Sequence, residues 1–142
     1  HRGHCHAFFD GQHLVGDWEN GRIYTMSMDS FDDAGDEMCR ELITTHFRTG
    51  KRAFYGELEV RMETGAGRIA GQGSDPRLML ATSTDQGQTW GSWRYASMGR
   101  RGRYLERVTF SRLGSGDSMT FRLRVTDPVK VVMTGASVEV LS

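Results

Sequence analysis

Apolar and polar residues alternate along several short segments of the chain, which is typical of strands that bury one face. In residues 57–63, every second position is Leu, Val or Met, and the positions between are Glu or Arg. Residues 107–111 and 121–126 repeat this pattern, with Val, Phe and Leu on one side and Arg, Thr and Ser on the other. A period of two places the two sets on opposite faces of a strand. Each segment therefore predicts a strand with one buried and one solvent-exposed face.

Turn residues divide the rest of the chain into further short strands. Asp10-Gly11 and Asn20-Gly21 are dipeptides typical of hairpins. They predict three strands in the first 26 residues. Further strands are expected at residues 41–48, 77–82, 92–96, 129–133 and 137–141. Only Asp36 to Leu42 suggests a helix, and that segment is short and uncapped. The Gly-rich composition of residues 64–75 predicts a flexible connection.

About nine or ten strands and no convincing helix predict an all-β fold. We expect an antiparallel β-sandwich, or a barrel-like variant, of about nine strands within one domain spanning residues 1–142. Residues 1–50 resemble a blade-like β-meander, and residues 51–142 form the expected main sandwich. A whole propeller needs about four strands in each of at least four blades. The chain lacks an initiator Met, so we interpret it as the C-terminal fragment of a longer protein, with the end of a propeller-containing protein as one interpretation.

Residues 83–90 read S-T-D-Q-G-Q-T-W, which is the S-x-D-x-G-x-T-W pattern called an Asp box. Asp85 is expected to accept backbone hydrogen bonds across a tight turn, and Gly87 to adopt a positive φ. Thr89 is expected to restart a strand, and Trp90 to place its ring under the hairpin. The pattern is common in sialidase-like propellers and concerns architecture rather than catalysis. The predicted structural residues are Ser83, Asp85, Gly87, Thr89 and Trp90.

Charge is balanced overall but unevenly distributed. The chain has 18 basic and 18 acidic residues, for a formal net charge of zero. Residues 1–45 hold nine acidic and three basic residues, and residues 91–124 hold eight arginines and two acidic residues. This asymmetry suggests copies that meet head to tail, or two different partners, although solvated strand faces explain it too.

Cys5 and Cys39 are expected to be free, buried thiols, and no apolar run is long enough for a membrane helix.

The side chains that bear chemistry match no known site. His1, His4, Cys5, His6 and His13 are ligand types for zinc or nickel, but their spacing fits no familiar closed site. The acidic residues 29–37 do not follow the calcium loop of an EF-hand. Nucleophile-elbow and metalloprotease motifs are absent from the sequence. We therefore expect no catalytic residue, no metal and no cofactor.

Arginines interleaved with aromatic residues follow the Asp box in the sequence. Such a surface can track a nucleic-acid backbone, but arginine is also common on the solvent face of strands. Packaged DNA is accordingly a weak candidate partner. The predicted interface or DNA-facing residues are Arg100, Arg101, Arg103, Arg107 and Arg112.

The order of these segments resembles a known family. The segments in question are residues 13–24, 58–65, the Asp box, 97–104, 107–114 and 121–129. Together they resemble the C-terminal part of packaged-DNA stabilisation proteins, which are tail accessory proteins of short-tailed bacteriophages and of prophages. The resemblance implies a non-enzymatic virion protein at the portal–tail junction that helps to retain DNA. It also implies other tail or portal proteins as partners, a homo-oligomeric ring, and assembly in the host cytoplasm. The alternative is a sialidase-like module that binds or processes carbohydrate.

Overall fold

The computed structural model describes residues 3–141, and every regular element within them is a β-strand. The chain divides into two compact units, with the division between Met38 and Cys39. Residues 40–43, 47 and 48, which lie within the expected N-terminal meander, pair with a strand of the second unit. The all-β class predicted from the alternation is confirmed. The predicted extent of a single domain over residues 1–142 stays a prediction.

The first unit contains a three-stranded antiparallel meander of β1 (Gly3–Phe9), β2 (Gln12–Asp17) and β3 (Ile23–Met26). Both hairpins form where the turn dipeptides predicted them. Asp10 and Gly11 have φ of 48° and 73°, as a two-residue hairpin that follows the strand twist requires. Val15 is the one buried large hydrophobic residue among residues 3–38, while Phe8, Phe9 and Trp18 are exposed.

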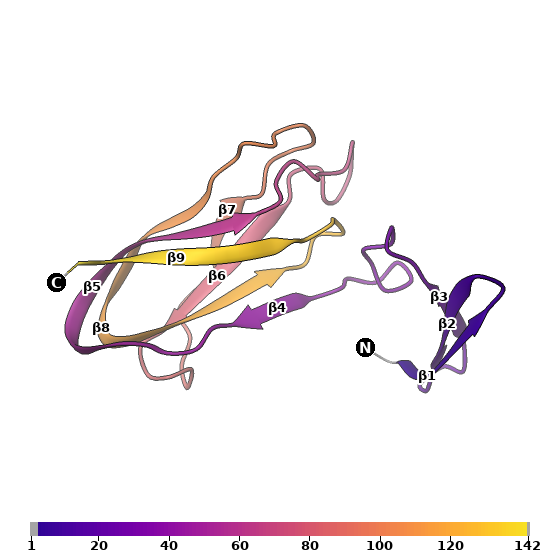
Figure 1. Ribbon diagram of the computed structural model, residues 1–142, viewed down its shortest axis with the longest axis horizontal. Coiled ribbons are helices and arrows are strands. Elements are labelled where there is room, and N and C mark those ends of the chain that lie inside the picture. The colour runs from indigo at the N-terminus through magenta and orange to yellow at the C-terminus, as the bar shows by residue number, and fades with distance from the viewer. Residues whose placement is uncertain (1–2, 142) are drawn as a thin grey trace. The chain divides into compact units, whose positions relative to one another are not determined.

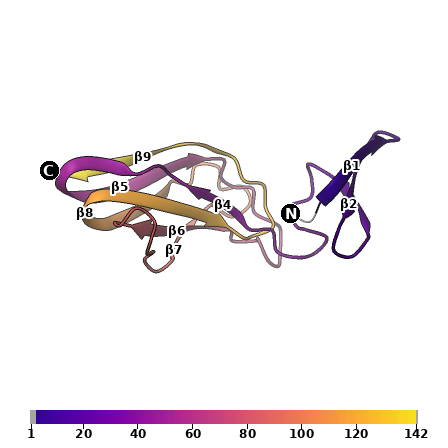
Figure 2. The same cartoon turned by 90° about the horizontal axis from the view of Figure 1, so that it is seen from below.

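The second unit is the predicted sandwich. Its strands are β4 (Arg40–Ile43), β5 (Phe47–Met62), β6 (Arg77–Ser83), β7 (Arg94–Ser97), β8 (Val108–Val125) and β9 (Met133–Leu141). Residues 108–119 of β8 pair with β5, which in turn pairs with β9. Residues 120–125 of β8 pair with β6 and β4, and β6 pairs with β7. β8 therefore belongs to both antiparallel sheets (Figure 1), and Figure 2 shows β5 and β9 in one layer with β6 and β7 in the other.

Some strand boundaries differ from the sequence prediction. The segments 107–111 and 121–126, predicted as separate strands, are the two ends of the 18-residue β8. Arg112 and Gly114 adopt positive φ of 57° and 104°, and the pairing with β5 shifts register nearby. Such irregularities bend a strand without ending it. The predicted strand 41–48 is instead divided between β4 and β5, and residues 129–132 lie before β9 rather than in a strand of their own.

The core lies between the two sheets and is built from the apolar sets that the alternation predicted. Leu58 and Val60 of β5 are each 3% exposed, and Phe121 and Val125 of β8 are fully buried. Leu78 and Leu80 of β6 complete the opposite wall. Burial of one face of each strand is the main favourable contribution to such a fold.

The Gly-rich residues 64–75 are not a loose connection, because they pack against residues 98–105 at one end of the sandwich. Gly65 donates its N–H to Met98 O and accepts from Gly102 N. A Cβ at Gly67 would lie 3.0 Å from Arg101 N, and one at Gly99 would lie 3.2 Å from Gly65 N. The glycines are needed for this close approach of two backbones. Both loops lie at the same end of the sandwich in Figure 1.

The two cysteines are free, as expected, but the prediction that they are buried was wrong. Cys5 lies on β1 and Cys39 directly precedes β4, and both are exposed. Because β1 is an edge strand of a meander with little core, its side chains have no layer to cover them.

Candidate interaction surfaces

The segment Ser83–Trp90 forms a tight turn at the end of β6, and its polar residues are bonded to one another. Asp85 Oδ1 accepts hydrogen bonds from Ser83 Oγ at 2.6 Å and from Thr89 N at 2.9 Å. Asp85 Oδ2 accepts from Thr89 Oγ1. Ser83 Oγ in turn accepts from Gly87 N at 2.8 Å. The carboxylate therefore holds the two ends of the turn together.

The backbone of this turn explains its residue types. Gln86 and Gly87 have φ of 64° and 89°, so two successive residues adopt the left-handed conformation. The hydrogen bonds from Ser83, and then those from Thr89, hold the pKa of Asp85 well below its usual range. Thr89 does not restart a strand, because residues 88–93 are irregular and β7 begins at Arg94. The Trp90 ring does lie beneath the turn, where a Cβ at Gly87 would be 3.4 Å from Cζ2.

Arginines and tryptophans stack on the outer face of the sheet that contains β4, β6, β7 and β8. The Arg122 guanidinium lies 5.5 Å from the ring centroids of both Trp90 and Trp93. Arg124 lies 4.5 Å from the Trp93 centroid. Such cation–π contacts are attractive and stabilise the stack. The sequence pattern predicted that Arg122 and Arg124 point outward, but it did not predict their stacking, because Trp93 comes from a different strand connection.

Glu41 completes this group from the edge strand β4. Its carboxylate bonds to Arg122 Nη2 at 3.0 Å and to Arg124 Nη2 at 2.6 Å. The hydrogen bond from Arg122, with Arg124 as a further cause, lowers the pKa of Glu41. One carboxylate therefore neutralises part of the charge of two arginines and ties β4 to β8.

Four of the five predicted arginines lie between β7 and β8. Three of them belong to residues 98–105, which we call the arginine loop, and Arg107 directly precedes β8. Arg100, Arg101 and Arg103 are exposed, and Arg100 makes a 3.5 Å ion pair with Asp75. Arg100 and Arg101 line a hollow of about 500 Å³ together with residues of the Gly-rich loop. The lining residues from that loop are Arg68, Ile69, Ala70, Ser74 and Asp75.

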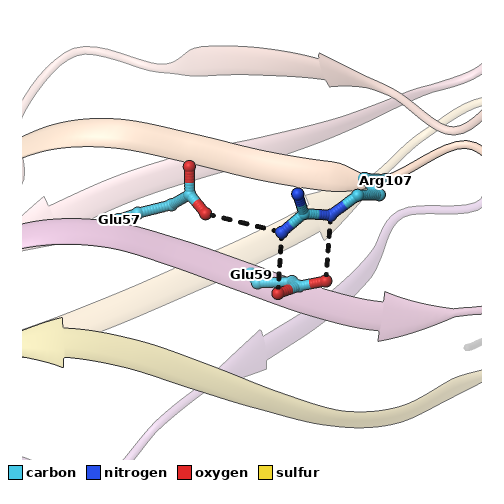
Figure 3. Close-up of polar contacts among 3 residues, drawn as sticks. All are labelled: Glu57, Glu59 and Arg107. Carbon is cyan, nitrogen blue, oxygen red and sulfur yellow. Dashed lines mark hydrogen bonds and ion pairs between the residues drawn. The ribbon is translucent and has the colours of Figure 1, made fainter.

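The other two predicted arginines are separate from this hollow. Arg107 is paired with two carboxylates of β5, with Nη2 3.1 Å from Glu59 Oε2 and 3.8 Å from Glu57 Oε1 (Figure 3). These carboxylates raise the pKa of Arg107. Arg112 lies within β8, at the bend. The five arginines therefore do not form one continuous row.

The tyrosines that a sialidase-like site would use are dispersed within the part of the chain that the structure describes. Tyr55 is buried in the core and donates to Phe47 O, and Tyr95 lies under Arg77. Tyr104 is exposed on the arginine loop and does not line the hollow. Tyr24 belongs to β3 of the first unit.

No group of three or more His, Cys, Asp or Glu side chains among residues 3–141 is arranged to hold a metal ion. His1, one of the five side chains weighed for metal binding, lies outside the described residues. The expectation of no metal and no cofactor stays a prediction. No helix in the described part is long and apolar enough to cross a membrane.

Comparison with known proteins assigns the second unit to a family. A comparison with curated proteins gave no match. A family model described as the β-sandwich of bacteriophage P22 Gp10 matches residues 39–141, which begin where the second unit begins and cover more than two thirds of the chain. The expected resemblance to bacteriophage structural proteins and the predicted sandwich are thus confirmed. The chain belongs to the family of the bacteriophage P22 Gp10 β-sandwich domain.

Proposed function

We propose that this chain is a non-enzymatic structural component of a phage or prophage virion, located at the portal–tail junction, where it helps to retain packaged DNA. Membership of the Gp10 β-sandwich family is the observation that carries the proposal, because the match spans all but the last residue of the second unit. Its partners are other tail or portal proteins, further copies of the chain and, less directly, packaged DNA. Assembly takes place in the host cytoplasm.

The arrangement of the second unit supports a role in assembly. Its most basic exposed segment, the loop that carries Arg100, Arg101 and Arg103, is packed on the Gly-rich loop rather than free. A pre-ordered charged surface loses little conformational entropy on binding and selects its partner by charge. We propose that these three arginines face a virion partner. Arg107 already has two carboxylate partners and contributes less.

The Asp-box residues have a structural role in this proposal. Ser83, Asp85, Gly87 and Thr89 are bonded to one another within the turn, and Trp90 packs beneath it. They hold the end of the sandwich opposite to the arginine loop, where Figure 1 shows the connection between β6 and β7. The sialidase-like alternative has no comparable support, because the arginines and tyrosines lie apart.

The proposal is tested by removing the gene from the phage or prophage that encodes the chain. We expect DNA to be packaged but then lost, so that particles become sensitive to nuclease and to dilution. Complementation with the wild-type gene restores DNA retention, whereas Arg100→Glu/Arg101→Glu restores less. Lys51→Glu/Arg52→Glu is the matched control, because it makes the same change of charge at exposed positions of β5. Particles that retain DNA without the gene would contradict the proposal.

A further inference from the structure

The hollow beside the arginine loop has the properties of a binding site for an acidic segment. Arg68 and Arg101 have no ion-pair partner among residues 3–141, and the ion pair of Arg100 with Asp75 is exposed and long at 3.5 Å. Ile69 is 82% exposed in the lining, and Leu105 of the arginine loop is 97% exposed. Cationic groups beside exposed apolar side chains are the composition of a protein interface rather than of a solvated loop.

The first unit carries a segment that is complementary to this hollow. Residues 29–37, which we call the acidic turn, contain Asp29, Asp32, Asp33, Asp36 and Glu37. None of these carboxylates has an ion-pair partner among the described residues. The turn is ordered, because Asp33 and Asp36 exchange two backbone hydrogen bonds of 3.0 Å and Asp32 Oδ1 accepts from Gly35 N. Met28, which is 91% exposed, directly precedes the turn and adds an apolar side chain.

The charges of the two units favour this pairing over a longer range. Residues 1–38 hold eight acidic and two basic side chains, for a net charge of −6, and residues 39–142 hold ten acidic and 16 basic side chains, for +6. Opposite net charges steer two such surfaces toward each other and repel like surfaces. A chain that carries both surfaces is complementary to another copy of itself.

We propose that the acidic turn of one copy docks into the hollow lined by Arg68, Arg100 and Arg101 of a second copy. The contact is heterologous: each copy uses a different surface, so the association continues into a ring or chain of copies. This inference rests on the homo-oligomeric part of the proposed function and names the surfaces that would form it. The inference can fail while the proposed function holds, because a virion component can be held in place by other proteins alone.

The test measures the mass of the 142-residue chain in solution as a function of concentration and salt, by light scattering and sedimentation. We expect self-association in 50 mM NaCl and a dissociation constant at least about tenfold higher in 500 mM NaCl, because salt screens exposed charges. Arg100→Glu/Arg101→Glu is expected to weaken association by at least about tenfold in 50 mM NaCl. Lys51→Glu/Arg52→Glu is the matched control and is expected to associate like the wild type.

A charge swap separates this contact from a general effect of charge. Asp32→Lys/Asp33→Lys alone is expected to weaken association as the arginine reversal does, and mixing the two variants restores it. A wild-type chain that stays monomeric at high concentration, or variants that associate unchanged, would overturn the inference. Circular dichroism of each variant verifies that the sandwich is folded. If the chain is found in virions and yet fails this test, the inference falls and the proposed function stands.

Discussion

At the scale of single residues, the structure is most constrained where backbones approach closely. Gly99 has φ of +81°, and a Cβ there would lie 2.7 Å from Arg103 O. Gly102, three residues further, has a similar φ of +87° but open space around it. A substitution at either glycine therefore carries the same conformational cost, and only a substitution at Gly99 adds a steric clash.

We predict that Gly99→Ala lowers the melting temperature more than Gly102→Ala does. A left-handed φ costs a non-glycine residue roughly 1 kcal/mol, and only Gly99→Ala adds a clash with backbone that cannot move freely. Thermal unfolding followed by circular dichroism measures the difference. Equal melting temperatures for the two variants would show that the backbone around Gly99 is not as close-packed as described.

Asp85 gives a second prediction at this scale, on the dependence of stability on pH. Hydrogen bonds from Ser83 and Thr89 lower its pKa in the folded state, so the ionised carboxylate stabilises the fold above its unfolded pKa of about 3.9. That stabilisation is lost as pH falls through the lower, folded pKa. Asp85→Asn is thus expected to unfold at a lower urea concentration than the wild type at pH 7.

The difference between Asp85→Asn and the wild type should shrink as the pH is lowered below about 4. Asp117→Asn, a change at an exposed carboxylate near the same turn, serves as the control and should leave the urea midpoint near that of the wild type. A difference that persists unchanged at low pH would mean that the carboxylate charge does not hold the turn.

At the scale of elements, β8 is the strand on which the sandwich depends, because it pairs in both sheets. Phe121 lies where β8 passes into the second sheet, is fully buried, and has its ring 5.6 Å from that of Phe47. We predict that Phe121→Ala destabilises the second unit by about 3–5 kcal/mol, a large part of the 5–15 kcal/mol typical of domains.

Urea unfolding measures this cost, and Phe54→Ala is the matched control. Phe54 lies on β5 but is 63% exposed, so its truncation should change stability by less than about 0.5 kcal/mol. Similar losses for the two variants would contradict the assignment of the core.

Periodicity found the core faces of β5 and β8, because burial of one face imposes a period of two directly on the sequence. The same periodicity predicted two strands in place of β8, because the alternation is interrupted around the bend at Arg112 and Gly114, as it is in a turn between strands. Asp85 and Gly87 were identified because a tight turn restricts residue type, whereas the stack of Arg122, Trp90 and Trp93 depends on pairing between distant strands, which no local pattern records.

At the scale of the whole molecule, the two units differ in the size of their buried hydrophobic core. Residues 39–142 contain the buried cluster of the sandwich, whereas Val15 is the one large hydrophobic residue buried in the described part of the first unit. A small three-stranded sheet without a covered face is marginal in water. Stability should therefore reside mainly in the second unit.

We predict that a chain of residues 39–142 unfolds cooperatively in urea, and that residues 1–38 alone show no cooperative transition. Circular dichroism and the dispersion of amide signals in NMR spectra distinguish the two outcomes. An unfolded 39–142 fragment would show instead that the sandwich depends on the first unit.

The most direct test of the central claim is to locate the chain in particles of the phage or prophage that encodes it. Quantitative mass spectrometry of purified virions, combined with cryo-electron microscopy of the portal–tail junction, provides the measurement. We predict several copies per particle, with density for the sandwich at that junction. Absence of the chain from purified particles, or its presence only elsewhere in the virion, would contradict the account.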